Sequence, residues 1–253
     1  MRNGGQTAQA REDLAEKISG GGALGSIAGN LAAVSARIAA AAMRSGRDPA
    51  DVTLIAVSKT KSAAAVMEAY RAGQRFFGEN RVQEALKKME ETGAGPLWHL
   101  IGHLQGNKAK RVPGRFAAVH SVDSERIALA LEEHAGRAGE RLEVFIQLNW
   151  QGEDTKAGVN DATGLRKLTE TVSGCSHLVL RGLMTIPRPN MSEAQTRGLY
   201  ANIRSLHDGI KSEFGLGHDF NQLSFGMSHD FEWAVEEGAT MVRVGTAIFG
   251  ARQ

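Results

Sequence analysis

The feature that most constrains the fold is a regular alternation of short apolar runs with longer helical stretches. The apolar runs are rich in β-branched residues, which predicts buried strands. They occupy residues 53–58, 75–78, 98–102, 117–122, 143–149, 178–185, 222–226 and 241–245. The predicted helices between them are 63–72, 81–91, 104–111, 124–138, 160–173, 192–213 and 228–237. Strands that alternate with helices in this way predict a parallel sheet.

Eight strands are also the number that closes a (β/α)8 barrel of the TIM type at about this chain length. The competing fold, a doubly wound open sheet, usually carries a G-x-G-x-x-G turn after its first strand. Here the first turn reads SKTKS and contains no glycine. We therefore predict an α/β fold with one barrel domain over residues 26–253, in which an amphipathic helix over 27–46 precedes the strands. The short segment IFGARQ after the last strand leaves no room for a second domain.

Composition excludes several classes of protein. A net charge of +2 argues against a nucleic-acid partner that depends on bulk charge. No apolar run is long enough to span a membrane, and no C-x-x-C or H-x-x-x-H pattern indicates structural zinc. The single Cys175 fits a reducing compartment, so we expect a cytoplasmic protein. Residues 1–25 are charged and end in GGGALG, which predicts a flexible tail rather than a signal peptide.

The stretch VTLIAVSKTKS, residues 52–62, ends the first strand on two lysines. Ser62 is typical of a helix N-cap, and Lys61 directly before it is expected in solvent. Lys59 alternates with Val57, so it emerges on the face that carries buried side chains. We therefore expect the amine of Lys59, and not that of Lys61, to lie in a pocket.

Glycines and hydroxyl residues follow the seventh and eighth strands, where barrels of this type often bind phosphate. Gly226 allows a close backbone approach, and Ser228, after Met227, can begin a helix whose free N–H groups face an anion. Gly245 and Thr246 add a bare N–H group and a hydroxyl. Taken singly, Ser228 is explained by capping and Gly245 by a turn. Because glycine and hydroxyl residues follow both strands, the two loops together favour a phosphate site.

Arg243 lies in the middle of the eighth strand, between Val242 and Val244. A buried guanidinium keeps its charge and needs an acceptor, which is either a carboxylate inside the barrel or a ligand. Asn80 is also open to two interpretations, because it begins a predicted helix with Gln83 at the third position and capping alone would explain it.

A buried lysine, a phosphate site and an arginine that needs an acceptor together indicate pyridoxal 5'-phosphate (PLP). Lys59 would form a Schiff base with the PLP aldehyde, and Arg243 would face the pyridine nitrogen. The alternative is a barrel that binds another phosphorylated metabolite, with Lys59 acting only through its charge.

The sequence resembles the pyridoxal phosphate homeostasis protein family, whose fold is that of the barrel domain of alanine racemase. The matching blocks, between about residues 28 and 252, are LIAVSKTK, FGENRVQEA, WHLIGHLQGNK, GLMTIP and LSFGMSHDFEWAVEEGATMVRVGTAIFG. The resemblance implies PLP as cofactor and a Schiff base on Lys59. It implies the following further contacts to the cofactor: Asn80 in the pocket, Ser228, Gly245 and Thr246 around the phosphate, and Arg243 at the ring nitrogen. Met227, directly before Ser228, is also expected to contact the cofactor.

The resemblance also implies a protein that handles the cofactor rather than an enzyme. An arginine at the ring nitrogen keeps the ring unprotonated, which weakens the electron sink that amino-acid chemistry requires. Racemases with this barrel use a tyrosine from a second domain, whereas Tyr70 and Tyr200 lie in predicted helices. We expect a monomer that holds PLP without robust turnover and whose candidate recipients are apo-forms of PLP-dependent enzymes. The alternative is a racemase-like enzyme.

Overall fold

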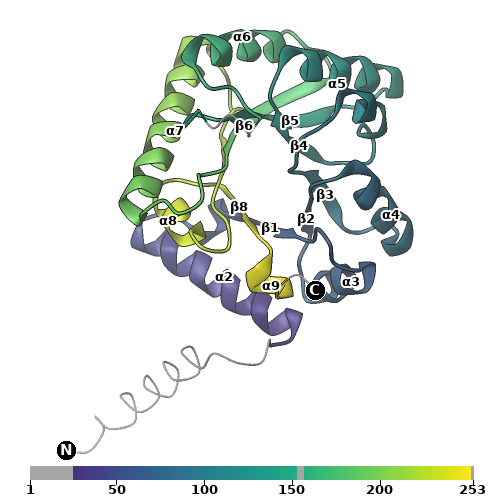
Figure 1. The fold of residues 1–253 in the computed structure, drawn as a ribbon, viewed down its shortest axis with the longest axis vertical. Coiled ribbons are helices and arrows are strands. Elements are labelled where there is room, and N and C mark those ends of the chain that lie inside the picture. Colours follow the sequence, from purple (N-terminus) through teal and green to yellow (C-terminus); the bar gives the residue numbers. More distant parts are fainter. Residues whose placement is uncertain (1–24, 153–156, 252–253) are drawn as a thin grey trace, which may run out of the picture.

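The computed structural model describes residues 25–152 and 157–251, so the predicted flexible tail lies outside the described residues except for Gly25. Eight parallel strands close into a barrel in chain order, and β1 pairs with β8 (Figure 1). The strands are β1 Thr53–Val57, β2 Phe76–Glu79, β3 Leu97–Leu100, β4 Ala118–Val122, β5 Leu142–Leu148, β6 Leu178–Thr185, β7 Gln222–Ser224 and β8 Met241–Val244. The predicted (β/α)8 barrel is therefore confirmed, and the open sheet is wrong.

Helices surround the barrel as an outer ring (Figure 1). The α-helices are α2 Ile27–Arg44, α3 Ala63–Arg71, α4 Val82–Thr92, α5 Glu125–Ala138, α6 Ala162–Ser173, α7 Glu193–Glu213, α8 Phe231–Glu236 and α9 Thr246–Phe249. Two short 3-10 helices are η1 Pro49–Asp51 and η2 Gly106–Arg111. Every one of these strands begins within one residue of its predicted start, and most of them end one or two residues earlier than predicted.

The N-terminal helix α2 closes the side of the barrel next to β1 and β8. Ser26 caps it by accepting a hydrogen bond from the Gly29 N–H at 3.1 Å. Its predicted apolar stripe is buried at Leu31, Val34 and Ile38. This stripe packs against α8 and α9, the elements that follow β7 and β8, as the purple and yellow segments in Figure 1 show. The helix thus supports the two loops in which the sequence places the phosphate site.

The apolar core has two layers, as expected for this barrel. The larger layer lies between strands and helices, and a smaller cluster fills the barrel interior. The buried members of the interior cluster are Ile55, Ala118, Phe145, Met184 and Met241. Ile55 belongs to β1, two residues before Val57, so the side of β1 that leads to Lys59 faces inward as predicted.

Three helix predictions need correction. The predicted helix 104–111 is a shorter 3-10 helix, η2, which begins at Gly106. Leu104 precedes it and is buried in the core. The predicted helix 228–237 begins at Phe231, with Asp230 at its N-cap. The four-residue helix α9 was not predicted. All three differences lie at the end of the barrel where the strands terminate.

No helix among the described residues combines the length and the apolarity that crossing a membrane requires. The same residues contain no group of three or more His, Cys, Asp or Glu side chains placed to hold a metal ion. Cys175 is partly buried, and its Sγ lies 3.3 Å from the carbonyl oxygen of Thr171. Burial raises the pKa of this thiol to about 11, so it stays protonated at neutral pH.

Candidate functional site

A cavity of about 230 Å³ lies at the C-terminal ends of the strands, and we call it the inner pocket. It brings together all of the predicted site residues: Lys59, Asn80, Met227, Ser228, Arg243, Gly245 and Thr246. Four more residues line it that the sequence did not single out: Val57, Ile101, Ile186 and His229. The period-2 alternation of β1 could have identified Val57, because Lys59 was found by the same signal. The contact of these residues with a cofactor stays a prediction.

Lys59 projects from a turn that is fixed on both sides. The Ser58 N–H donates to the Gly78 carbonyl at 3.1 Å, and the Lys61 N–H donates back to the Ser58 carbonyl at 2.9 Å. Thr60 has a φ of 65°, which is rare for a residue with a side chain. Its N–H donates to Oε1 of Glu84 at 2.6 Å. The strained turn is therefore held by contacts to β2 and α4, and it defines where the Lys59 side chain begins.

Behind this turn lies a buried group of charges that we call the Lys88 cluster. The Lys88 ammonium donates to Oε1 of Glu79 at 2.7 Å and to Oε1 of Glu84 at 3.1 Å. It also donates to the Ser58 carbonyl at 2.7 Å, and the Ser58 hydroxyl donates to Glu79 at 2.6 Å. Burial raises the pKa of Glu79, and the hydrogen bonds from Lys88 and Ser58 only partly offset it. The cluster contacts the residues on both sides of Lys59.

Lys61 has a different environment from Lys59. Its ammonium donates to the Ala251 carbonyl at 2.7 Å, close to the end of the described chain. It does not line the inner pocket. The sequence placed Lys61 in solvent, whereas the structure leaves it partly buried, with its amine held at the chain end outside the inner pocket. Its hydrogen bond to Ala251 was not predicted, because nothing local in the sequence links these two residues.

The loops after β7 and β8 meet through Ser228. Its hydroxyl accepts the Gly245 N–H at 3.3 Å, so the hydroxyl and the backbone of the β8 loop lie together at the inner pocket. The prediction that Ser228 begins a helix is wrong, because Asp230 is the N-cap of α8 and its Oδ1 accepts the Met227 N–H at 2.5 Å. Ser228 instead lies in the turn before α8, where its hydroxyl faces β8.

Gly226 allows this turn to form. Its φ is +94°, and a Cβ atom there would lie 2.5 Å from the Cβ of Ala234. On the other loop, Thr246 is the first residue of α9, so its N–H group has no carbonyl partner within that helix. Two hydroxyls and the N–H groups around Gly245 therefore form a donor-rich end of the inner pocket.

Arg243 is buried in β8, with 4% of its surface exposed. One guanidinium nitrogen donates to the carbonyl and hydroxyl oxygens of Ser224, at 2.6 and 2.7 Å, and another donates to the Thr185 carbonyl at 2.9 Å. Burial lowers the pKa of this guanidinium to about 10, so it is still charged at neutral pH. Its hydrogen-bond acceptors among the described residues are neutral, so the carboxylate pair considered from the sequence is not formed.

A chain of buried hydrogen bonds continues inward from Arg243. Ser224 Oγ lies 2.8 Å from Nδ1 of His120, and Nε2 of His120 lies 2.8 Å from Nδ1 of His99. Burial lowers the pKa of His99 to about 4 and that of His120 well below its usual range, so both rings are neutral. His99 is a core residue, as predicted. The Arg243 end of the inner pocket therefore rests on a rigid, neutral network.

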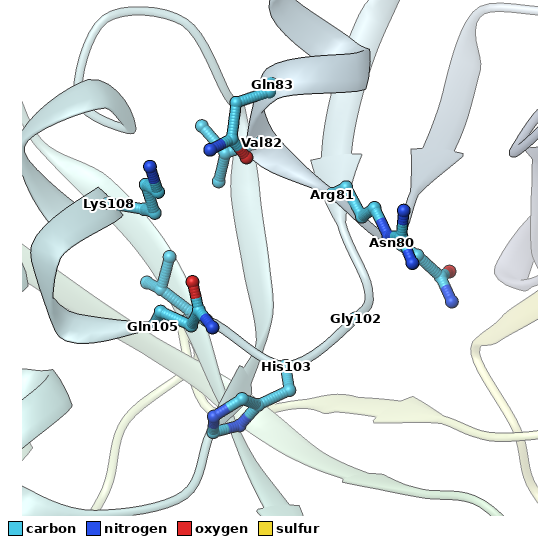
Figure 2. Close-up of a pocket in the computed structure, with 9 residues that line it drawn as sticks. Asn80, Arg81, Val82, Gln83, Gly102, His103, Gln105 and Lys108 are labelled. Carbon is cyan, nitrogen blue, oxygen red and sulfur yellow. The ribbon is translucent and has the colours of Figure 1, made fainter.

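Asn80 lies between β2 and α4. The capping interpretation is wrong, because Arg81 is the N-cap residue of α4 and makes no side-chain cap hydrogen bond. Asn80 lines the inner pocket and also a second cavity next to it. In Figure 2 its amide points away from Lys108 and Gln105, which line only the second cavity. Asn80 thus separates the two cavities.

The closed barrel and its lysine-bearing pocket define a protein of the alanine racemase barrel class. The family model for the alanine racemase N-terminal domain matches residues 29–253. The chain belongs, within that class, to the pyridoxal phosphate homeostasis protein family. It is 48% identical over 230 residues to the Pseudomonas aeruginosa pyridoxal phosphate homeostasis protein, covering 90% of this chain and 97% of that one. The Escherichia coli K12 protein of the same name is 43% identical over 230 residues, covering 89% and 97%.

Solved structures agree with this assignment. PipY of Synechococcus elongatus PCC7942 without PLP is 41% identical, with a TM-score of 0.77, and the match covers 85% of this chain and 99% of PipY. PipY with PLP bound is 40% identical, with a TM-score of 0.75, covering 86% and 100%. Alanine racemase from Corynebacterium glutamicum shares 19% identity at a TM-score of 0.64, covering 87% of this chain and 61% of the racemase. That last similarity shows the fold alone.

Proposed function

We propose that this protein binds PLP in the inner pocket and takes part in PLP homeostasis. The observation that carries the proposal is the convergence, in one cavity, of a lysine, a buried arginine and a pair of hydroxyl-bearing loops. The PipY structure with PLP bound, at 40% identity, supports it. The names of the Pseudomonas and Escherichia relatives support the role in homeostasis.

The donor set fits the groups of PLP. When bound, PLP supplies an aldehyde that condenses with a lysine amine to form a Schiff base. Lys59 would provide that amine at the β1 side of the pocket. Ser228, Thr246 and the Gly245 N–H would hold the phosphate with charge-assisted hydrogen bonds. Arg243 would donate a hydrogen bond to the ring nitrogen. Because the guanidinium would keep its proton, the ring nitrogen would stay unprotonated.

We further propose that the protein does not turn over amino acids. A proton transfer on two faces of a substrate needs a second proton carrier opposite Lys59. Tyr200 is buried and donates its hydroxyl proton to Asp230 at 2.9 Å, and Tyr70 packs against Arg75. Neither tyrosine lines the inner pocket. PLP and apo-forms of PLP-dependent enzymes are the proposed partners, and a monomer in a reducing cytoplasm stays the expected state.

One observation favours the racemase-like alternative. His229 is exposed and lines the inner pocket, so its imidazole is a candidate second proton carrier. Incubation of the PLP-loaded protein with L-alanine in deuterated water, followed by NMR and chiral chromatography, decides between the two proposals. We expect no catalytic accumulation of D-alanine. Multiple turnovers that Lys59→Ala and His229→Ala each abolish would establish the enzyme.

PLP binding itself is tested by comparing Lys59→Ala with Lys61→Ala. We expect the protein to form a yellow, borohydride-reducible adduct that Lys59→Ala abolishes and Lys61→Ala retains. The two lysines differ by two positions and by environment, which makes Lys61 a matched control. Loss of the adduct in Lys61→Ala alone would contradict the assignment, and no adduct in the unmodified protein would contradict PLP binding through a lysine.

A further inference from the structure

A second and larger cavity, which we call the outer pocket, lies between the start of α4 and the loop after β3. It measures about 430 Å³, within the range of small-molecule sites. Its lining residues are Asn80, Arg81, Val82, Gln83, Gly102, His103, Leu104, Gln105 and Lys108 (Figure 2). Only Asn80 is shared with the inner pocket. The PLP proposal gives this cavity no role.

The outer pocket carries positive charge without a balancing carboxylate in its lining. Arg81 and Lys108 contribute cations, and His103 adds an imidazole, whereas no Asp or Glu is among the lining residues. Within the described residues, the side chains of Arg81 and Lys108 form no ion pair or hydrogen bond with another residue. Two acids lie just outside the lining: Oδ2 of Asp123 lies 3.0 Å from Nδ1 of His103, and Glu84 is near enough to Arg81 for their charges to interact. Lys108 has no such neighbour among the described residues. The pocket therefore favours an anion.

The start of α4 adds to this potential. Its N-cap residue, Arg81, makes no side-chain cap hydrogen bond. The first N–H groups of α4 therefore have no capping oxygen from this residue. Arg81 lines the outer pocket, so the partial positive charge at this helix end supports the effect of the Lys108 ammonium.

The remaining polar groups indicate what else the anion carries. Figure 2 shows the amides of Gln83 and Gln105 and the amine of Lys108 around the same space between α4 and η2. An amide donates and accepts hydrogen bonds, which suits hydroxyl groups. No Phe, Tyr or Trp lines the cavity, so it offers no aromatic surface on which a nucleotide base or a pyridine ring could stack.

The wall between the two pockets is closely packed. A Cβ atom at Gly102 would lie 2.4 Å from the carbonyl oxygen of Asn80, so only glycine lets the end of β3 pack against that residue. The outer pocket is therefore a separate site rather than an extension of the inner one. We propose that it binds a small phosphorylated metabolite bearing hydroxyl groups, of the sugar-phosphate class.

The test is calorimetric titration with D-ribose 5-phosphate, with D-ribose and inorganic phosphate as reference ligands. It is run on the protein as purified and again after saturation with PLP, because the second condition occupies the phosphate end of the inner pocket. We expect ribose 5-phosphate to bind in both conditions, more tightly than inorganic phosphate, and D-ribose to give no signal. The first condition gives an answer even if PLP binding fails.

The matched variants are Lys108→Gln and Lys110→Gln, which remove one charge each from η2. Lys108 lines the outer pocket and Lys110 does not. We expect Lys108→Gln to weaken ribose 5-phosphate binding by about tenfold or more, as loss of a charge-assisted hydrogen bond does. Lys110→Gln should leave the dissociation constant unchanged, and both variants should bind PLP normally.

Three results would overturn the proposal. The first is no binding of ribose 5-phosphate at millimolar concentration, and the second is equal weakening by Lys108→Gln and Lys110→Gln, which would indicate diffuse charge. The third is loss of binding on saturation with PLP, which would locate the ligand in the inner pocket. Equal affinity for inorganic phosphate and ribose 5-phosphate would show that the pocket does not recognise the sugar, which would contradict the sugar-phosphate class.

Discussion

The two sides of the inner pocket hold their buried cations in opposite ways. Behind the β1–β2 side, the Lys88 ammonium is paired with two carboxylates, Glu79 and Glu84. On the β7–β8 side, the acceptors that the described part of the chain offers Arg243 are carbonyl and hydroxyl oxygens. A paired charge is already satisfied by the protein, whereas a buried guanidinium among neutral acceptors can gain from a further electron-rich group. The comparison separates a cation that supports the fold from one that is available to a ligand.

The difference also explains how the pocket can be rigid and receptive at once. The Lys88 cluster fixes the turn that carries Lys59 from both sides, through Ser58 and through the Glu84 contact to Thr60. Arg243 is fixed by Ser224 and Thr185 but keeps its charge toward the cavity that it lines. Preorganised groups of this kind lose little conformational freedom when a ligand binds.

The largest expected effect is a loss of stability when the buried ion pair of the β1–β2 side is broken. Lys88→Met leaves the buried Glu79 carboxylate without its ammonium, and we expect the free energy of unfolding to fall by about 3–5 kcal/mol. Urea denaturation measures it. Lys87→Met is the matched control, because Lys87 is exposed and lies 3.9 Å from Glu91, a surface pair of little energetic value. A loss of similar size in both variants would show that pairing is not what stabilises this side.

A smaller effect is expected on the β7–β8 side, where ligand binding and not folding should respond. Ser228→Ala and Thr246→Val each remove one hydroxyl, and we expect each to weaken PLP binding by about 1–3 kcal/mol. The free energy of unfolding without PLP should change little, since Thr246 is exposed and Ser228 is partly exposed.

Titration with pyridoxal, which lacks the phosphate, is the control for these two variants. If the hydroxyls act on the phosphate, the variants should lose PLP affinity and keep the weaker affinity for pyridoxal. Equal dissociation constants of the unmodified protein for PLP and pyridoxal would show that this end of the pocket holds no phosphate.

The periodicity of the sequence predicted the barrel because strand and helix patterns are local. The same local signal identified Lys59, which lies two residues beyond Val57 on the inward side of β1. It also indicated the loops that carry Ser228 and Thr246, and both residues line the inner pocket. These residues lie within a few positions of a strand end, so the strand boundaries are enough to find them.

What the sequence could not predict depends on contacts between distant residues. Ser228 was expected to cap α8, but its hydroxyl accepts the N–H of Gly245, seventeen positions further along the chain. Lys88 appears in the sequence as one of two adjacent lysines on an amphipathic helix, where solvent exposure is the ordinary expectation. Its burial follows from the packing of α4 against β2, which brings it to Glu79.

The smallest expected effect is a pH dependence of the free energy of unfolding that arises from Glu79 on the paired side. Burial raises the pKa of Glu79 in the folded protein above its ordinary value of 4.5. The folded state therefore retains a proton that the unfolded state releases as the pH rises past that value. Stability from this group is fully present below the ordinary value and is lost as the pH rises toward the folded pKa, by at most about 1.4 kcal/mol per pH unit.

Glu79→Gln removes this titration and keeps a side chain of the same shape. The free energy of unfolding of the unmodified protein, relative to that of Glu79→Gln, should therefore decrease as the pH rises through this window. Glu91→Gln, an exposed substitution on helix α4, is the matched control and should retain the decrease, because Glu79 is still present. Urea denaturation at several pH values measures all three proteins. A relative stability that increases with pH would mean that the hydrogen bonds from Lys88 and Ser58 outweigh the desolvation of Glu79, and that the paired side favours the carboxylate after all.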